Sequence, residues 1–127
     1  MRIIVTDAVT GSSPIKISNP FPLYKWKLIS ISAEVTGTST ADSSVIFTLV
    51  RHGAELVLIN LSSSSTVLTN AASLEGFVQS SSAGSSETGN LVFPLYLGVN
   101  DDFDEYINVA FVNNGSITWE IIFEEEL

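Results

Sequence analysis

The sequence predicts an all-β protein, an antiparallel β-sandwich of about eight strands. Many short segments alternate apolar and polar residues, and this period of two is typical of strands with one buried and one solvated side. Glycine, proline, serine and asparagine separate these segments, as expected of turns. No segment has helical periodicity over enough residues to predict a helix. The 127 residues suit a single domain, residues 1–127, with one hydrophobic core.

The two closing strands show the clearest pattern. Residues 113–116, Asn-Asn-Gly-Ser, separate two alternating runs. If the strands pair, a loop over 113–115 with a left-handed Gly115 and a bulge places Phe111 opposite Ile117 and keeps both on the buried side. The same pattern holds if the two strands lie in different sheets, as in a jelly roll. The apolar sides comprise Ile107, Val109 and Phe111 in the first strand, and Ile117, Trp119, Ile121 and Phe123 in the second.

The N-terminal part predicts an edge strand and then a long strand. Arg2 to Val5 is a short apolar run that we expect at a sheet edge, and residues 1–22 form either this edge or an N-terminal arm. Residues 24–36 form the first long strand. Trp26 and Leu28 are out of phase with the rest of its apolar side, so we expect a bulge near Leu28. That apolar side comprises Ile29, Ile31, Ala33 and Val35.

A hairpin follows this strand. Residues 45–51 alternate and residues 56–61 are apolar throughout, and the segment 51–55, which contains His52 and Gly53, predicts the connection. Because the return strand is apolar on both faces, we expect it to be covered on both sides.

The middle of the chain is richer in serine and predicts weaker strands over 66–69 and 73–79. Residues 80–90 are low-complexity serine and glycine, which predicts a surface loop. Residues 91–99 predict a strand in which Pro94 favours an edge, a strand start or a bulge.

Composition limits the class of partner. Five lysines and arginines against fourteen acids give a net charge of −9, which argues against nucleic acid or an anionic membrane and favours solubility or docking on a basic surface. Only 15% of the residues are charged and the mean hydropathy is +0.35, so we expect other subunits to cover part of the apolar surface. No apolar run approaches about 18 residues, so no membrane-spanning helix is predicted.

The chain contains no cysteine, which excludes disulfides, thiolate chemistry and cysteine-bound zinc. The N-terminus lacks the charged, apolar and small-residue pattern of a signal peptide. We expect no cofactor.

Two acidic segments are candidate binding sites. The first, residues 101–104, lies on a predicted turn and offers carboxylate oxygens of the kind that Ca²⁺ prefers. Its spacing differs from that of an EF-hand loop, and this difference favours a solvated turn over a calcium site. The second is a terminal run that either faces solvent or contacts a basic partner. The candidate metal ligands are Asp101, Asp102 and Asp104, and the candidate partner-binding acids are Glu124, Glu125 and Glu126.

The sequence predicts no catalytic residue. His52 is the only histidine and lies in a predicted turn without a partner for general-base chemistry, and no serine lies in a Gly-x-Ser-x-Gly motif. Tyr24 and Trp26 flank Lys25, so we expect them to be exposed, where they could stack on a sugar or contact a partner. The nearby lysines are too few for a nucleic-acid patch.

Four stretches carry a resemblance to a known group of proteins. They are residues 24–35 (YKWKLISISAEV), 44–56 (SVIFTLVRHGAEL), 91–101 (LVFPLYLGVND) and the closing pair 106–125. In order they supply a tryptophan-bearing long strand, a hairpin with a glycine turn, a proline-containing strand and an acidic closing strand. This order resembles small bacteriophage virion proteins of single jelly-roll type, over most of residues 24–125. From the residues alone, jelly-roll and immunoglobulin-like topologies remain alternatives.

The resemblance implies a jelly-roll-like fold and an assembly role in the virion. It implies a non-enzymatic capsid decoration, cement or minor capsid (vertex) protein that contacts capsid proteins and its own copies, as a trimer or pentamer. Residues 1–22 are then our choice for an arm that reaches a neighbour. The alternative is a carbohydrate- or receptor-binding β-sandwich module, which requires Tyr24 or Trp26 to be exposed.

Overall fold

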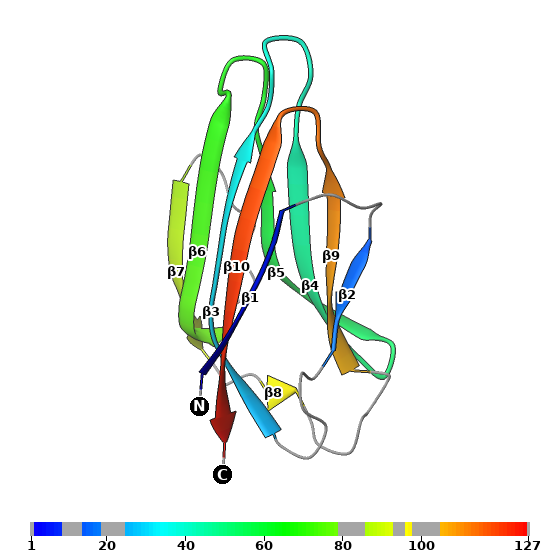
Figure 1. The fold of residues 1–127 in the computed structure, drawn as a ribbon, viewed down its shortest axis with the longest axis vertical. Helices are drawn as coiled ribbons and strands as arrows, with labels where there is room; N and C mark the ends of the chain where they lie inside the picture. Colours follow the sequence, from blue (N-terminus) through cyan, green and yellow to red (C-terminus); the bar gives the residue numbers. More distant parts are fainter. Residues whose placement is uncertain are drawn as a thin grey trace.

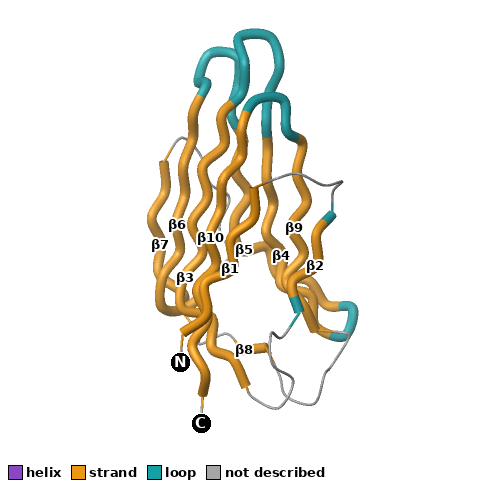
Figure 2. Tube along the Cα trace, in the orientation of Figure 1, coloured by secondary structure: helices purple, strands orange, loops and turns teal. Residues whose placement is uncertain are grey.

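Two β-sheets pack face to face in the computed structural model of the chain (Figures 1 and 2). The structure describes residues 2–8, 14–18, 25–78, 86–92, 96–97 and 105–126. These segments contain strands and connections but no helix, and therefore none that could cross a membrane. The predicted β-sandwich is confirmed.

The larger sheet has the strand order β1-β10-β3-β6-β7, with β8 paired to β3, and the smaller sheet has the order β2-β9-β4-β5. The strands are β1 (Arg2–Ala8), β2 (Ile15–Ile17), β3 (Lys25–Thr36), β4 (Ser44–Arg51), β5 (Ala54–Ser62), β6 (Thr69–Val78), β7 (Ser86–Val92), β8 (Tyr96–Leu97), β9 (Glu105–Val112) and β10 (Ser116–Glu126).

The strand pairs are nested along the chain. The antiparallel pairs β1–β10, β2–β9, β3–β6 and β4–β5 lie one inside the next, as in a long hairpin rolled up so that β10 also meets β3 and β9 also meets β4. Two interlocked Greek keys of this kind define a jelly roll. An immunoglobulin-like fold would instead keep sequential hairpins within one sheet, so the strand order resolves that alternative.

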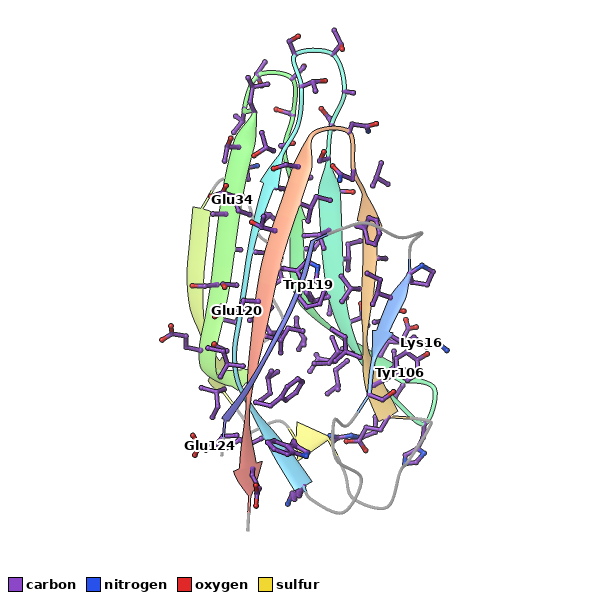
Figure 3. The ribbon with its side chains drawn as sticks, viewed as in Figure 1. Lys16, Glu34, Tyr106, Trp119, Glu120 and Glu124 are labelled. Atoms are coloured by element: carbon purple, nitrogen blue, oxygen red, sulfur yellow. The ribbon has the colours of Figure 1, made fainter. Side chains whose placement is uncertain are left out.

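The inner faces of the two sheets form one hydrophobic core. Alternate residues of β9 and β10 point inward as predicted, including Val109 and Ile121, both fully buried. Trp119 of β10 meets Phe47 of β4 edge to face, with ring centroids 5.8 Å apart, and this contact joins the sheets near the centre (Figure 3). Such aromatic pairs contribute about 0.5–1.5 kcal/mol beyond the area they bury.

Two bulges re-aim strands into this core. In β3, Leu28 lies opposite Phe123 and Ser30 lies opposite Ile122, so Ile29 is the extra residue. This confirms the bulge predicted near Leu28 and corrects the placement of Ile29, which is half-buried at the bulge instead of on the core side. In β5, Leu58 is the extra residue, which explains why Leu58 and its neighbour Ile59 are both fully buried.

Of the two arrangements that the sequence leaves open for the closing strands, the structure shows the one in which they lie in different sheets, and the paired alternative is not formed. β9 belongs to the smaller sheet and β10 to the larger, so residues 113–115 cross between sheets and Phe111 does not lie opposite Ile117. Gly115 does not have the left-handed backbone expected of a bulge; among the described residues only His52 and Gly53 have positive φ. Glycine is required at 115 because a Cβ there would overlap the carbonyl oxygen of Thr36.

Other local expectations also change. Residues 86–90 form part of β7 instead of a loop, because an edge strand needs backbone pairing on one side only. β7 runs parallel to β6, whereas the other described strand pairs are antiparallel. β5 is an edge strand with Val57 36% exposed, so it is not covered on both faces. Residues 66–68 are a connection, and the strand begins at Thr69.

The N-terminal residues form the predicted sheet edge. β1 pairs with β10 along its length and β2 pairs with β9, so residues 2–8 and 15–17 do not form a free arm in this structure. The remaining residues of the expected arm lie outside the described part of the chain.

The hairpin predicted around His52 and Gly53 is confirmed. These two residues connect β4 to β5 with φ of 51° and 84°, and Arg51 lies opposite Ala54. Positive φ at both central positions is the requirement of a two-residue type I′ turn.

Two glycine substitutions test these two turns. Gly115→Ala should lower the free energy of unfolding by about 3 kcal/mol or more, because the new methyl meets backbone that is fixed by the β3–β10 pairing. Gly53→Ala should cost only about 1 kcal/mol, because its site has open space and the cost is confined to the left-handed backbone. Urea denaturation measures both, and equal losses would contradict the close approach at Gly115.

Candidate interaction surface

Three connections meet at one end of the sandwich. Residues 37–43 join β3 to β4, residues 63–68 join β5 to β6, and residues 113–115 join β9 to β10 (Figure 1, top). We call these residues the loop end. Each connection crosses from one sheet to the other, so the loop end closes the core on this side.

Two buried serines hold the three loops together. The backbone N–H of Ser43 donates to Ser63 Oγ at 3.3 Å, and the backbone N–H of Ser63 donates to the Ser43 carbonyl at 2.9 Å. The hydroxyl of Ser43 accepts a bond from the backbone N–H of Asn114 at 2.9 Å. Both serines are at most 1% exposed, so these bonds form out of contact with water. Buried polar groups that lose such partners are costly, so the network fixes the relative positions of the loops.

Further hydrogen bonds surround this network. The side-chain amide of Asn114 donates to the Asp42 carbonyl at 2.6 Å, and the backbone N–H of Gly37 donates to the Leu68 carbonyl at 2.7 Å. The amide of Asn70 donates to the Ser62 carbonyl, while its Oδ1 is buried without a partner among the described residues. The loop end is therefore ordered in advance of any binding event.

The loop end exposes an apolar pair within a polar surface. Val67 and Leu68 are 40% and 45% exposed, which is unusual for large apolar side chains in this structure. Hydroxyl and amide side chains surround them in the sequence of the three loops, and the one charged residue there is Asp42. This combination suits a contact with a protein surface. The polar exposed residues are Thr38, Ser39, Thr40, Ser65, Thr66, Asn113 and Asn114.

The outer face of the larger sheet is acidic. Glu34 of β3, Glu75 of β6 and Glu120 of β10 lie on three adjacent strands with serine and threonine between them. Figure 3 labels Glu34 and Glu120 on this face. Glu34 and Glu75 are exposed and Glu120 is half-buried. Adjacent carboxylates of this kind favour hydration of the face.

The exposure predicted for Trp26 is wrong. Its side chain is 0% exposed, because the bulge at Ile29 turns it inward with Leu28 to extend the core. It therefore cannot stack on a sugar or serve as a surface contact in this structure. Tyr24, the other candidate, lies outside the described residues.

The acidic end of β10 lies beside basic residues of its own chain. Glu124 is opposite Lys27 and Glu126 is opposite Lys25 in the β3–β10 pairing, and Arg2 of β1 is opposite Glu124 on the other side. The opposite charges of Glu124 and Lys27 attract one another in this cross-strand position. Glu125 shares the row of the buried Trp26 and is half-buried. Contact of Glu124, Glu125 and Glu126 with a basic partner stays a prediction.

The other predicted chemical groups are only partly described. Asp101, Asp102 and Asp104 lie outside the described residues, and within the described part no three acidic or histidine side chains gather in a geometry for a metal ion. His52 is exposed in its turn, as predicted.

Sequence reasoning missed several residues that define the surface. Ser43 and Ser63 read as ordinary loop serines, because burial of a short polar side chain leaves no periodic signal. Val67 and Leu68 alternate too little to mark a surface, although an apolar pair inside a serine-rich segment is a signal of a surface contact. The ion pair between Arg51 and Glu105, with 3.1 Å between Nη2 and Oε1, joins residues far apart in sequence.

No protein-family model matches the chain, and no curated protein or solved structure matches it either.

Ser43→Ala tests the network of the loop end. The substitution removes the hydroxyl that accepts a hydrogen bond from the backbone N–H of Asn114. We therefore expect a loss of about 1–3 kcal/mol in the free energy of unfolding. Hydrogen exchange at the backbone N–H of Asn114 should become faster as well. Ser39→Ala, at an exposed serine of the same loop, should change stability by less than about 0.5 kcal/mol. Similar behaviour of the two variants would contradict the role assigned to Ser43.

Proposed function

We propose that the protein is a non-enzymatic structural component of a virion, a capsid decoration, cement or minor capsid (vertex) protein. It binds capsid proteins through the loop end and also contacts its own copies. The observation that supports this most is a jelly-roll sandwich whose loops are locked together by buried serines around an exposed apolar pair.

Pre-organisation favours a binding role for this end. A loop that is already ordered loses little conformational freedom when a partner docks, so more of the contact energy appears as affinity. Val67 and Leu68 supply apolar area, and the surrounding hydroxyls supply hydrogen bonds at the rim, which is the usual composition of a protein contact.

The jelly-roll fold alone supports more than one binding role, because capsid proteins and lectins both use it. Side chains distinguish these roles. Sugar binding relies on exposed aromatic rings, whereas the loop end contains no aromatic residue and Trp26 is buried. The apolar pair at Val67 and Leu68 therefore favours protein partners over carbohydrate.

Leu68→Asp tests the docking role of the loop end. We expect the affinity for capsids assembled from the major capsid protein of the same genome to fall by about tenfold or more, because a carboxylate replaces a buried apolar contact. Co-sedimentation of the purified chain with these capsids measures the loss. Thr118→Asp adds the same charge on the exposed face of β10 and should bind like the unmodified chain. If Leu68→Asp binds normally, the loop end is not the docking surface.

A further inference from the structure

The outer faces of the two sheets differ in charge. The outward residues of β4 and β9, the two central strands of the smaller sheet, include no charged side chain, whereas the larger sheet presents Glu34, Glu75 and Glu120 outward. We call the uncharged surface the neutral face. It consists of Ser44, Ile46 and Thr48 of β4, Tyr106, Asn108, Ala110 and Val112 of β9, and Val57 of β5.

The neutral face leaves apolar side chains in contact with solvent. Val112 is 57% exposed and Val57 is 36% exposed, on opposite sides of β4. Ile46 and Ala110, which lie opposite one another, are half-buried between them. The β4–β9 pairing across the centre of this face runs without a register shift, and the bulge at Leu58 lies in the edge strand β5.

Opposite charges lie at the two edges of the neutral face. Lys16 of β2 lies on one edge, with its Nζ 4.6 Å from the centre of the Tyr106 ring (Figure 3), and Glu55 of β5 lies on the other. Three strand spacings separate β2 from β5, about 14 Å, so these two residues are too far apart to pair within one molecule.

We propose that a second copy of this chain covers the neutral face, related by a two-fold axis parallel to the strands. That axis places β2 of each copy over β5 of the other, so Lys16 of each lies near the Glu55 carboxylate of its counterpart. In the register of the smaller sheet, Lys16 and Val57 lie at the same height along the strands. Glu55 is two residues from Val57 along β5, about 7 Å, which is within reach of a lysine side chain.

Charge selects a second copy as the occupant. A chain with net charge −9 repels its own copies, and the repulsion is least where two surfaces without acids meet. The edge charges are also self-complementary, since one two-fold operation forms both Lys16–Glu55 contacts at once. This inference deepens the self-association that forms part of the proposed function, and it gives a two-fold contact in place of the trimer or pentamer implied by the resemblance.

The size of the face sets the expected strength. β4, β5 and β9 are each about 26 Å long and the three-residue β2 is about 10 Å long, so at a strand spacing of about 4.8 Å the face covers roughly 420 Å² per copy, or about 850 Å² in total. Contacts of this size are typical of weak, transient association, so we expect a reversible dimer and not an obligate one.

Sedimentation velocity of the purified full chain, from low micromolar to millimolar concentration, tests the contact. The unmodified chain should show a monomer–dimer equilibrium. Val112→Glu should weaken the dimer by about tenfold or more, because it buries a charge at the contact. Thr118→Glu places the same charge on the outer face of the larger sheet and should leave the equilibrium unchanged.

A charge exchange tests the geometry. Lys16→Glu and Glu55→Lys alone should each weaken the dimer by bringing like charges together, and the double variant should restore the affinity to within about threefold of the original. Circular dichroism confirms that each variant is folded. A chain that remains monomeric at every concentration, an effect of Thr118→Glu as large as that of Val112→Glu, or a double variant without recovery would overturn the proposal.

This assay contains the chain alone, so its outcome is separate from that of the capsid-binding experiment. A monomer that still binds capsids overturns the neutral-face contact and leaves the proposed function standing. A dimer of the expected geometry that does not bind capsids overturns the proposed function and leaves the neutral-face contact standing.

Discussion

The packing of the two inner sheet faces determines the rest of the structure. Phe47 and Trp119 meet at the centre, and fully buried side chains extend this contact along the sandwich, including Trp26 and Phe123 near the end opposite the loops. Every strand must keep its apolar side on this one core, so a strand that falls out of phase requires a bulge. The bulges at Ile29 and Leu58 follow from that requirement.

The inward side of most strands could be predicted from the sequence, because period-two alternation reports burial directly. Pairing could not be predicted in the same way. β9 and β10 both point their apolar residues to the core, and that pattern is satisfied equally by a hairpin or by strands in opposite sheets. The lysines on either side of Trp26 favour exposure, but the bulge at Ile29 shifts the phase of the strand and turns Trp26 into the core.

Candidate site residues were harder to predict than the fold. Ser43 and Ser63 act through burial and through bonds between loops distant in sequence, and neither property has a local signature. The acids at the end of β10 have Lys25 and Lys27 as cross-strand neighbours, and these lie about 100 residues earlier in the chain, so the local sequence does not reveal them. Surfaces of this kind depend on tertiary pairing, which a single sequence does not fix.

The surfaces divide the molecule into regions with different chemistry. An ordered loop end carries an apolar pair, one sheet face is acidic and well suited to hydration, and the other is uncharged. A chain that binds a lattice at one end and its own copy on one face would join neighbouring positions on that lattice. Cryo-electron microscopy of virions from the same genome tests this account most directly. We predict density for the jelly roll on the capsid with the loop end against the shell; virions that lack the chain, or that hold it by the acidic sheet face, would contradict it.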